Sequence, residues 1–169
     1  MLKIIKSLSY SILVMTILNG CGMYSFTGAS IPAEAKTVSI KMFENKASLV
    51  EPTLAQLLTD ELRDRFVSQT RLNLVSQNGD LQIEGKITGY STTPIAIQGD
   101  QTAAMNRLTI TIKVKFTNLV DETKDFDSSF SRYQDYSSEQ DLGSVQAKLI
   151  DLINETLVND IFSRAVVNW

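Results

Sequence analysis

One stretch decides the fold: Leu108-Thr109-Ile110-Thr111-Ile112-Lys113-Val114-Lys115-Phe116. Apolar and polar residues alternate along its whole length, which is the pattern of a β-strand with one buried face. The apolar side chains need a layer of structure to cover them, and the polar side chains point to the opposite side of the sheet. The stretch therefore predicts a sheet that is covered on one face only.

Four further segments read as strands, because they alternate or contain short apolar pairs. They are 37–43, 72–74, 81–88 and 126–130. In the first segment, Val38, Ile40 and Met42 share the predicted core side. At the third segment, Gly85 and Gly89 lie in register with the apolar residues, which predicts room on the core face for a helix to approach closely.

The connections between these segments carry turn signals. Asn78-Gly79 predicts a tight hairpin turn, because both residues tolerate positive φ. Asp121-Glu122-Thr123-Lys124 predicts a second turn. Residues 91–106 leave two possibilities open: a long loop that carries apolar side chains, or a longer hairpin whose strands extend into this segment.

Two segments have helical periodicity. Leu54, Leu58, Leu62 and Phe66 recur every four residues and form one apolar stripe. Pro52 suits the first turn of this helix, which should end near Gln69. A second helix is expected to start at Ser138 or Asp141, which can cap it, and its apolar stripe runs over 142–161.

Together these elements predict an α+β fold over residues 36–169, a single domain. We expect a two-layer sandwich, in which two helices cover one face of a mostly antiparallel mixed sheet of four to five strands. The crossover through the first helix can set its flanking strands parallel. The polar face of the sheet is left open to water or to a partner.

The N-terminus reads as a secretory signal peptide over residues 1–20. Lys3 and Lys6 precede a short apolar run that closes on Leu18-Asn19-Gly20-Cys21. This ending looks like a bacterial lipobox, in which Cys21 receives a diacylglycerol and becomes the new N-terminus. The alternative is an ordinary signal peptide in which the cysteine falls there by chance.

Lipidation at Cys21 would fix the protein to a membrane. Two or more acyl chains give near-permanent attachment, whereas one chain binds only marginally. The residue after the cysteine is Gly22 rather than aspartate, which favours the outer membrane. Residues 21–35 are then a lipidated tether between the membrane and the folded domain.

The composition excludes several classes of chemistry. The chain has 169 residues with 16 basic and 19 acidic side chains, a net charge of −3, no histidine and one cysteine. A Ser-His-Asp triad, a histidine-based metal site and an internal disulfide are therefore impossible. We expect no catalytic residue, no metal and no cofactor, and an acidic chain is a poor binder of nucleic acid.

One concentrated basic feature remains, on the polar side of the stretch that decides the fold. Arg107, Lys113 and Lys115 alternate with core residues and so share one face of the strand. They are candidates for binding an anionic group such as a phosphate. The alternative is a row of ordinary solvated strand residues.

The motifs of the mature chain resemble one known family. In order they are Gly-Met-Tyr-Ser-Phe-Thr-Gly after Cys21, Lys36-Thr37-Val38-Ser39-Ile40, Phe43-Glu44-Asn45, Pro52-Thr53-Leu54, Leu81-Gln82-Ile83-Glu84-Gly85, Ile87-Thr88-Gly89-Tyr90 and Asn106-Arg107-Leu108-Thr109-Ile110. This series resembles the LptE family of lipopolysaccharide-assembly lipoproteins, in the form found in Bacteroidetes-type bacteria.

The resemblance implies a small sheet packed on two helices and no catalytic residues. It implies a lipoprotein of the outer membrane that faces the periplasm or a barrel lumen, plugs the LptD β-barrel, helps it assemble and contacts lipopolysaccharide. The assignment of lipopolysaccharide binding to Arg107, Lys113 and Lys115 comes from the charge pattern instead. The alternatives are an auxiliary periplasmic lipoprotein of a phospholipid transporter and a general protein-interaction lipoprotein, while a serine–lysine or acid-pair hydrolase has no supporting motif.

Overall fold

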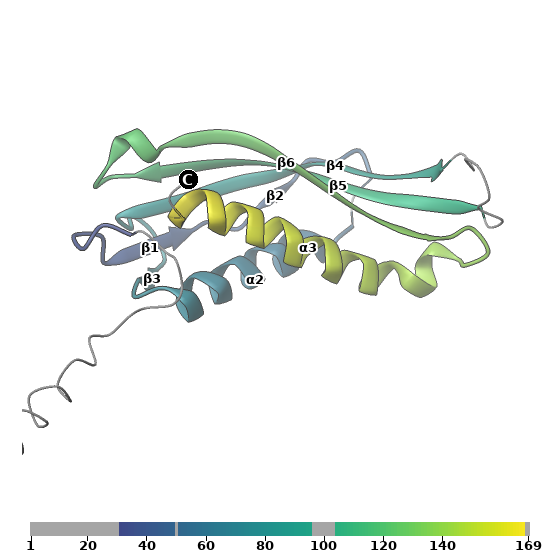
Figure 1. Cartoon of the computed structure of the whole chain (residues 1–169), viewed down its shortest axis with the longest axis horizontal. Helices are drawn as coiled ribbons and strands as arrows, with labels where there is room; N and C mark the ends of the chain where they lie inside the picture. The colour runs from purple at the N-terminus through teal and green to yellow at the C-terminus, as the bar shows by residue number, and fades with distance from the viewer. Residues whose placement is uncertain (1–30, 50, 96–103, 168–169) are drawn as a thin grey trace, which may run out of the picture.

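The computed structural model describes residues 31–49, 51–95 and 104–167. The predicted signal peptide, Cys21 and most of the predicted tether lie outside these residues. In the described part, two helices lie side by side against one face of an open mixed sheet, and the other face has no helix on it (Figure 1). This confirms the predicted α+β sandwich.

Six strands form the sheet: β1 (Thr37–Ile40), β2 (Glu44–Asn45), β3 (Asn73–Val75), β4 (Leu81–Ile95), β5 (Met105–Asn118) and β6 (Phe126–Ser137). Their order is β3-β1-β4-β5-β6, and β2 also pairs with β4. β1 runs parallel to both of its neighbours, while β4, β5 and β6 form antiparallel pairs. The strand count exceeds the prediction because β2 has only two residues, too few to show an alternating pattern.

The stretch that decides the fold lies in β5, between β4 and β6. Its apolar residues are fully buried, from Leu108 at 0% exposure to Phe116 at 1%. β4 and β5 extend until Ile95 pairs with Met105, so the longer hairpin is the correct alternative for residues 91–106. Residues 96–103 lie outside the described part.

Helices α2 (Leu54–Gln69) and α3 (Leu142–Val166) form the second layer. The predicted stripe of α2 is buried from Leu54 to Phe66, and Pro52 precedes the helix rather than lying in its first turn. The helices run parallel, since Gln146 near the start of α3 donates to Glu51 just before α2, and Phe162 meets Phe66 edge to face near their other ends. Within the described residues, no helix combines the length and apolar character that crossing a bilayer requires.

The prediction of a hairpin at Asn78-Gly79 is wrong, although Asn78 does have a positive φ of 54°. The strands on either side, β3 and β4, do not pair with each other, because β1 lies between them and is parallel to both. The connection passes so close to β1 that a Cβ on Gly79 would lie 2.6 Å from the Ser39 backbone nitrogen. A glycine is therefore needed there for close approach.

This crossing is fastened to β1 by side-chain hydrogen bonds. The Gly79 backbone N–H donates to Ser39 Oγ over 3.2 Å. The Asp80 carboxylate accepts from the backbone N–H groups of Lys36 and Thr37 and from the Thr37 hydroxyl, over 2.8, 2.9 and 2.8 Å. Ser39 alternates with the core residues of β1, so the connection crosses on the face away from the helices and buries Ser39 there.

The core side of the first strand segment also differs from the prediction after Ile40. β1 ends at that residue, so Met42 is 50% exposed while Phe43 is buried. The Phe43 ring covers Gly85, where a Cβ would lie 2.5 Å from Phe43 Cε1. The room predicted at Gly85 is thus real, and an aromatic ring fills it instead of a helix.

Gly89 lies on the opposite side of the sheet from the predicted one. The register of β4 against β5 shifts between Ile87 and Gly89, which marks a β-bulge. The shift reverses which residues face the helices, so Tyr90 is buried and Gly89 lies against the Thr111 side chain.

Candidate functional site

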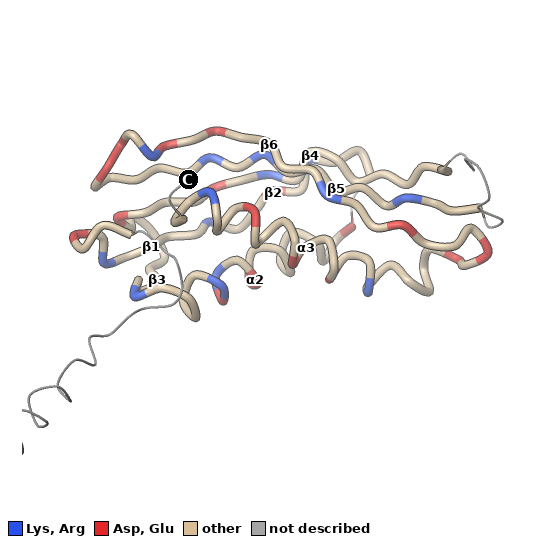
Figure 2. The backbone as a smooth tube through the Cα atoms, viewed as in Figure 1, with Lys and Arg blue, Asp and Glu red and all other residues tan. Residues whose placement is uncertain are grey.

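The open face is the sheet face opposite α2 and α3. On β5 it is formed by the polar residues that alternate with the core, including Lys113 and Lys115. The register places Lys113 between Lys86 of β4 and Ser129 of β6, and Lys115 between Glu84 and Asp127. Figure 2 shows the positions of basic and acidic residues interspersed along these strands.

The lysine hollow is a depression of about 290 Å³ in this face. Four lysines and three carboxylates line it, together with Met42 and Gly85: Lys41, Lys86, Lys113, Lys115, Glu44, Glu84 and Asp127. The strand order β1-β4-β5 gathers these side chains from segments that are far apart in the sequence. The hollow brings together the two predicted lysines and adds Lys41 and Lys86.

Ion pairs hold three of these lysines. Glu84 accepts from Lys41 over 2.9 Å and lies 3.8 Å from Lys115, while Lys113 lies 3.1 Å from Asp127. The hydrogen bond from Lys41 lowers the pKa of the Glu84 carboxyl, and the charges of Lys41 and Lys115 add to this effect. All these side chains are about half exposed or more, so each pair contributes only about 0–1 kcal/mol and can open readily.

Lys86 differs from its neighbours in the hollow, because it has no ion pair among the described residues. Its position on the open face follows from the alternation of β4, so the sequence pattern could have indicated it. The alternation predicted over 37–43 likewise puts Lys41 on the polar side, but its position beside the other lysines depends on the pairing of β1 with β4, which the sequence pattern does not give.

Arg107 is not part of the hollow. Six residue steps along β5, at about 3.3 Å each, place it about 20 Å from Lys113. Its Nε and Nη2 atoms donate to the two carboxylate oxygens of Asp135 over 2.7 and 2.9 Å, and its guanidinium lies 3.6 Å from the centre of the Tyr133 ring. These hydrogen bonds lower the pKa of Asp135 and raise that of Arg107. The structure thus separates Arg107 from the other two predicted site residues.

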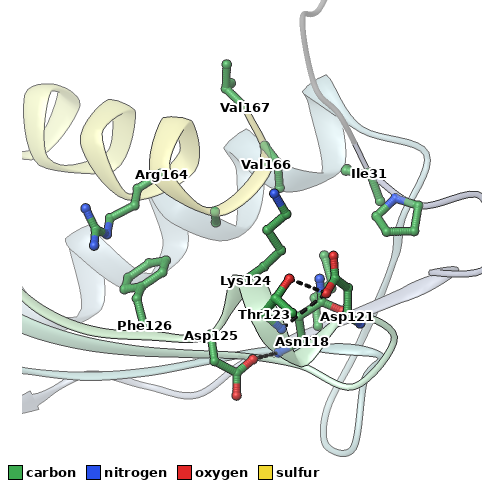
Figure 3. Close-up of a pocket in the computed structure, with 13 residues that line it drawn as sticks. Ile31, Asn118, Asp121, Thr123, Lys124, Asp125, Phe126, Arg164, Val166 and Val167 are labelled. Carbon is green, nitrogen blue, oxygen red and sulfur yellow. Dashed lines mark hydrogen bonds between the residues drawn. The ribbon is translucent and has the colours of Figure 1, made fainter. Parts of the chain in front are cut away.

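A second depression, the end cavity, lies where the described chain begins (Figure 3). It has a volume of about 440 Å³ between Ile31, the end of α3 and the turn that joins β5 to β6. This turn contains η1 (Glu122–Lys124), where the Asp121 carboxylate accepts from the Thr123 backbone N–H over 3.1 Å.

The carboxylates of the end cavity serve the turn itself. Besides Asp121, the Asp125 carboxylate accepts from the Asn118 backbone N–H over 2.7 Å. The Arg164 guanidinium lies 5.0 Å from the centre of the Phe126 ring, as Figure 3 shows. The arrangement explains the shape of the turn and gives no convergent set of groups for chemistry.

One acidic residue on the helix layer, Glu61, lies in a perturbed environment. Glu61 has a raised pKa, caused first by burial against α3 and then by the nearby carboxylates, while Arg65 opposes the shift. These neighbours include no nucleophile that Glu61 could activate. Over the described ranges, no group of three or more potential metal ligands comes together.

Comparisons with known proteins add a family and a fold. The LptE family model, described as lipopolysaccharide-assembly, matches residues 35–165. No curated protein matches the chain significantly.

Among solved structures, a minor lipoprotein from Acinetobacter baumannii has a TM-score of 0.50 and 12% identity, covering 77% of this chain and 91% of that one. A Helicobacter pylori protein, described as a homologue of a neuraminyllactose-binding hemagglutinin, has a TM-score of 0.51 and 12% identity, covering 83% and 88%. At this identity the two structures show a shared fold.

The family match includes every strand and nearly all of both helices described above. It agrees with the sheet on two parallel helices and with the lipoprotein fold of the Acinetobacter structure. The chain therefore belongs to the LptE family of lipopolysaccharide-assembly proteins.

Proposed function

We propose that this protein is the lipid-anchored partner of an LptD-type β-barrel in the outer membrane. It plugs the barrel, helps it assemble and assists the delivery of lipopolysaccharide to the outer leaflet, without enzymatic activity. The observation that carries the proposal is the family match over residues 35–165. The order of motifs quoted above supports the further proposal that it is a Bacteroidetes-type member.

The anchor is the acylated Cys21 that the lipobox predicts. Residues 1–20 are removed as a signal peptide, and residues 21–35 connect the lipid to the domain that begins at residue 36. Ile31 and Pro32 line the end cavity, so the tether reaches the domain beside the end of α3 and the turn that joins β5 to β6. The domain then faces the periplasm or the barrel lumen.

The lysine hollow is the proposed contact for the phosphates of lipopolysaccharide. Lysine ammonium groups donate charge-assisted hydrogen bonds to phosphate oxygens, and four such groups lie in the hollow. Lys113 and Lys115, together with Lys41 and Lys86, would donate these hydrogen bonds. Arg107 lies outside the hollow and would contact the same lipopolysaccharide molecule further along β5. A bound phosphate would replace the carboxylate partners, whose exposed ion pairs contribute little.

The alternative function, that of an auxiliary lipoprotein of a phospholipid transporter that carries the lipid, would require an enclosed apolar cavity for the acyl chains. The two cavities described above are both lined by several charged side chains, which favours the lipopolysaccharide role.

Purification of the native lipoprotein from outer membranes in mild detergent tests the proposal. We expect a large β-barrel protein and lipopolysaccharide to accompany the wild-type chain. The control for the anchor replaces residues 1–21 with a cleavable signal peptide that has no lipobox, and this chain should lose membrane retention. Co-purification of phospholipid without any barrel would support the carrier instead.

A further inference from the structure

A second part of the open face lies beyond the β-bulge and has a different character from the lysine hollow. We define the distal face by its open-face side chains on three strands: Ser91, Thr93, Arg107, Thr109, Thr111, Ser131, Tyr133 and Asp135. The register pairs them directly across β4, β5 and β6, so they form one continuous surface.

The distal face carries hydroxyl groups and no net charge. Its two charged side chains, Arg107 and Asp135, neutralise each other through the paired hydrogen bonds described above. The remaining members are serine, threonine and tyrosine, and the Thr111 and Ser131 hydroxyls lie 2.9 Å apart within hydrogen-bond distance. An anionic ligand gains little from such a surface, and an apolar ligand would bury hydroxyls without partners.

Tyr133 is the exception on this polar surface, because its large ring is 51% exposed. The Arg107 guanidinium lies 3.6 Å from the ring centre, and the same guanidinium is fixed by Asp135. The ring is therefore held by its neighbours before any ligand arrives, which lowers the entropic cost of binding to it.

We infer that the distal face binds the sugar chain of the lipopolysaccharide molecule whose phosphates occupy the lysine hollow. A sugar ring has hydroxyls around its edge and C–H groups on its faces. The C–H groups can pack on the Tyr133 ring, while the hydroxyls can bond to Asp135, Arg107 and the threonines. This combination of a neutral polar surface and one exposed ring fits a saccharide better than it fits a phosphate or an acyl chain.

The spacing agrees with a single extended ligand. Arg107 and Lys113 lie about 20 Å apart on the same strand and the same face. A glycolipid with phosphates near the lysines can therefore run its sugars along β5 towards Tyr133. The inference rests on the proposed function for the choice of ligand, although the saccharide site can be tested without any phosphate.

The test uses two probes on the full-length lipoprotein in detergent. The first is lipopolysaccharide-derived oligosaccharide from which lipid and phosphate have been removed, and the second is the phosphorylated disaccharide of the lipid headgroup. Tyr133→Ala should weaken binding of the first probe about tenfold, the loss expected for an aromatic packing contact. Tyr133→Phe keeps the ring and should retain binding of the first probe. Tyr133→Ala should still bind the second probe, which excludes a general loss of folding.

Lys113→Glu is the matched control for the two sites. It should leave binding of the dephosphorylated probe unchanged and weaken binding of the phosphorylated disaccharide. The inference is overturned if the wild-type protein does not bind the dephosphorylated oligosaccharide, or if Tyr133→Ala binds it as well as wild type does. It is also overturned if Tyr133→Ala disrupts only the association with the barrel, because the distal face would then contact protein. The proposed phosphate contact fails separately, if Lys113→Glu has no effect on the phosphorylated probe.

Discussion

Arg107 and Asp135 are joined by two hydrogen bonds of nearly equal length, 2.7 and 2.9 Å, although they lie 28 residues apart in the sequence. They face each other directly in the register of β5 and β6. The pair therefore marks the correct alignment of these two strands, in addition to bracing Tyr133.

This pair predicts a pH-dependent contribution to stability. The pKa of Asp135 is lowered in the folded protein, so its carboxylate favours folding above the unfolded pKa, and this contribution is lost as the pH falls through the folded pKa. Asp135→Asn should lower the melting temperature at pH 7, and the difference from wild type should disappear between about pH 5 and pH 2. Thermal unfolding followed by circular dichroism measures both. In an Arg107→Gln background the same change should have a smaller effect, and an equal effect would contradict the assigned partner.

The connection from β3 to β4 crosses over β1, and this crossing predicts a strict requirement for glycine at position 79. A Cβ there would lie 2.6 Å from the Ser39 backbone nitrogen, and backbone cannot move aside cheaply. Gly79→Ala should destabilise the domain by about 1–3 kcal/mol, as overpacking does. Chemical denaturation gives the free energy of unfolding directly.

Gly143 provides the matched control for this substitution. An added Cβ would meet only the end of the Asp141 side chain, which can rotate away. Gly143→Ala lies in α3 and should be neutral or stabilising by about 0.4–1 kcal/mol. If Gly79→Ala and Gly143→Ala lowered the free energy of unfolding equally, close approach to β1 would not be the reason why glycine is required at position 79.

The lysine hollow predicts a loss of lipopolysaccharide binding when its charge is reversed. The double substitution Lys113→Glu with Lys115→Glu should weaken binding at least about tenfold, because two donors to phosphate become two repelling charges. Binding should be measured with purified lipopolysaccharide at moderate salt, where long-range attraction is screened. Lys148→Glu changes an exposed lysine on α3 and is the net-charge control for the single substitutions Lys113→Glu and Lys115→Glu, which should be measured beside the double variant. Unchanged affinity in the double variant would remove the hollow as the phosphate contact.

Removing the charge of Glu84 is expected to strengthen lipopolysaccharide binding, whereas reversing the lysine charges weakens it. Its carboxylate engages Lys41 and Lys115 in the ligand-free protein and so competes with a phosphate for the same donors. Glu84→Gln should therefore strengthen lipopolysaccharide binding about threefold to tenfold, since each exposed pair that must open costs up to about 1 kcal/mol. Its low pKa also means that acidification to about pH 5 should not reproduce this gain. A weaker affinity in Glu84→Gln would show that the carboxylate orients the lysines instead of competing.

Local patterns predicted the parts of the fold that depend on one segment at a time. The alternation around Ile112 identified the buried face of β5, and the four-residue spacing from Leu54 to Phe66 identified the buried stripe of α2. Each pattern depends only on which positions of its own segment are buried. It can therefore be recognised without knowing which other element covers those positions. The fold class followed because both patterns require the same single covered face.

Long-range pairing decided what local patterns could not. The insertion of β1 between β3 and β4 placed Asn78 in a crossing instead of a hairpin, and it also brought Lys41 into the hollow. The bulge after Ile87 reversed the predicted side of Gly89, because a single extra residue changes the parity of a strand. Arg107 fell outside the lysine set because six residue steps along the strand separate it from Lys113, a spacing of about 20 Å that the sequence already contained and that the shared alternation alone does not express.

The position of β1 also determines how the domain would bear mechanical load. A pull on a membrane tether at the N-terminus reaches β1 before any other strand, and β1 is hydrogen-bonded on both edges to strands that run in its own direction. Force along that direction loads the β1–β3 and β1–β4 hydrogen bonds in shear. The hydrogen bonds of both pairings must then break together, and they cannot be opened one at a time. The tether therefore pulls on a strand that is hydrogen-bonded along both of its edges, although its paired residues are far fewer than those of β5.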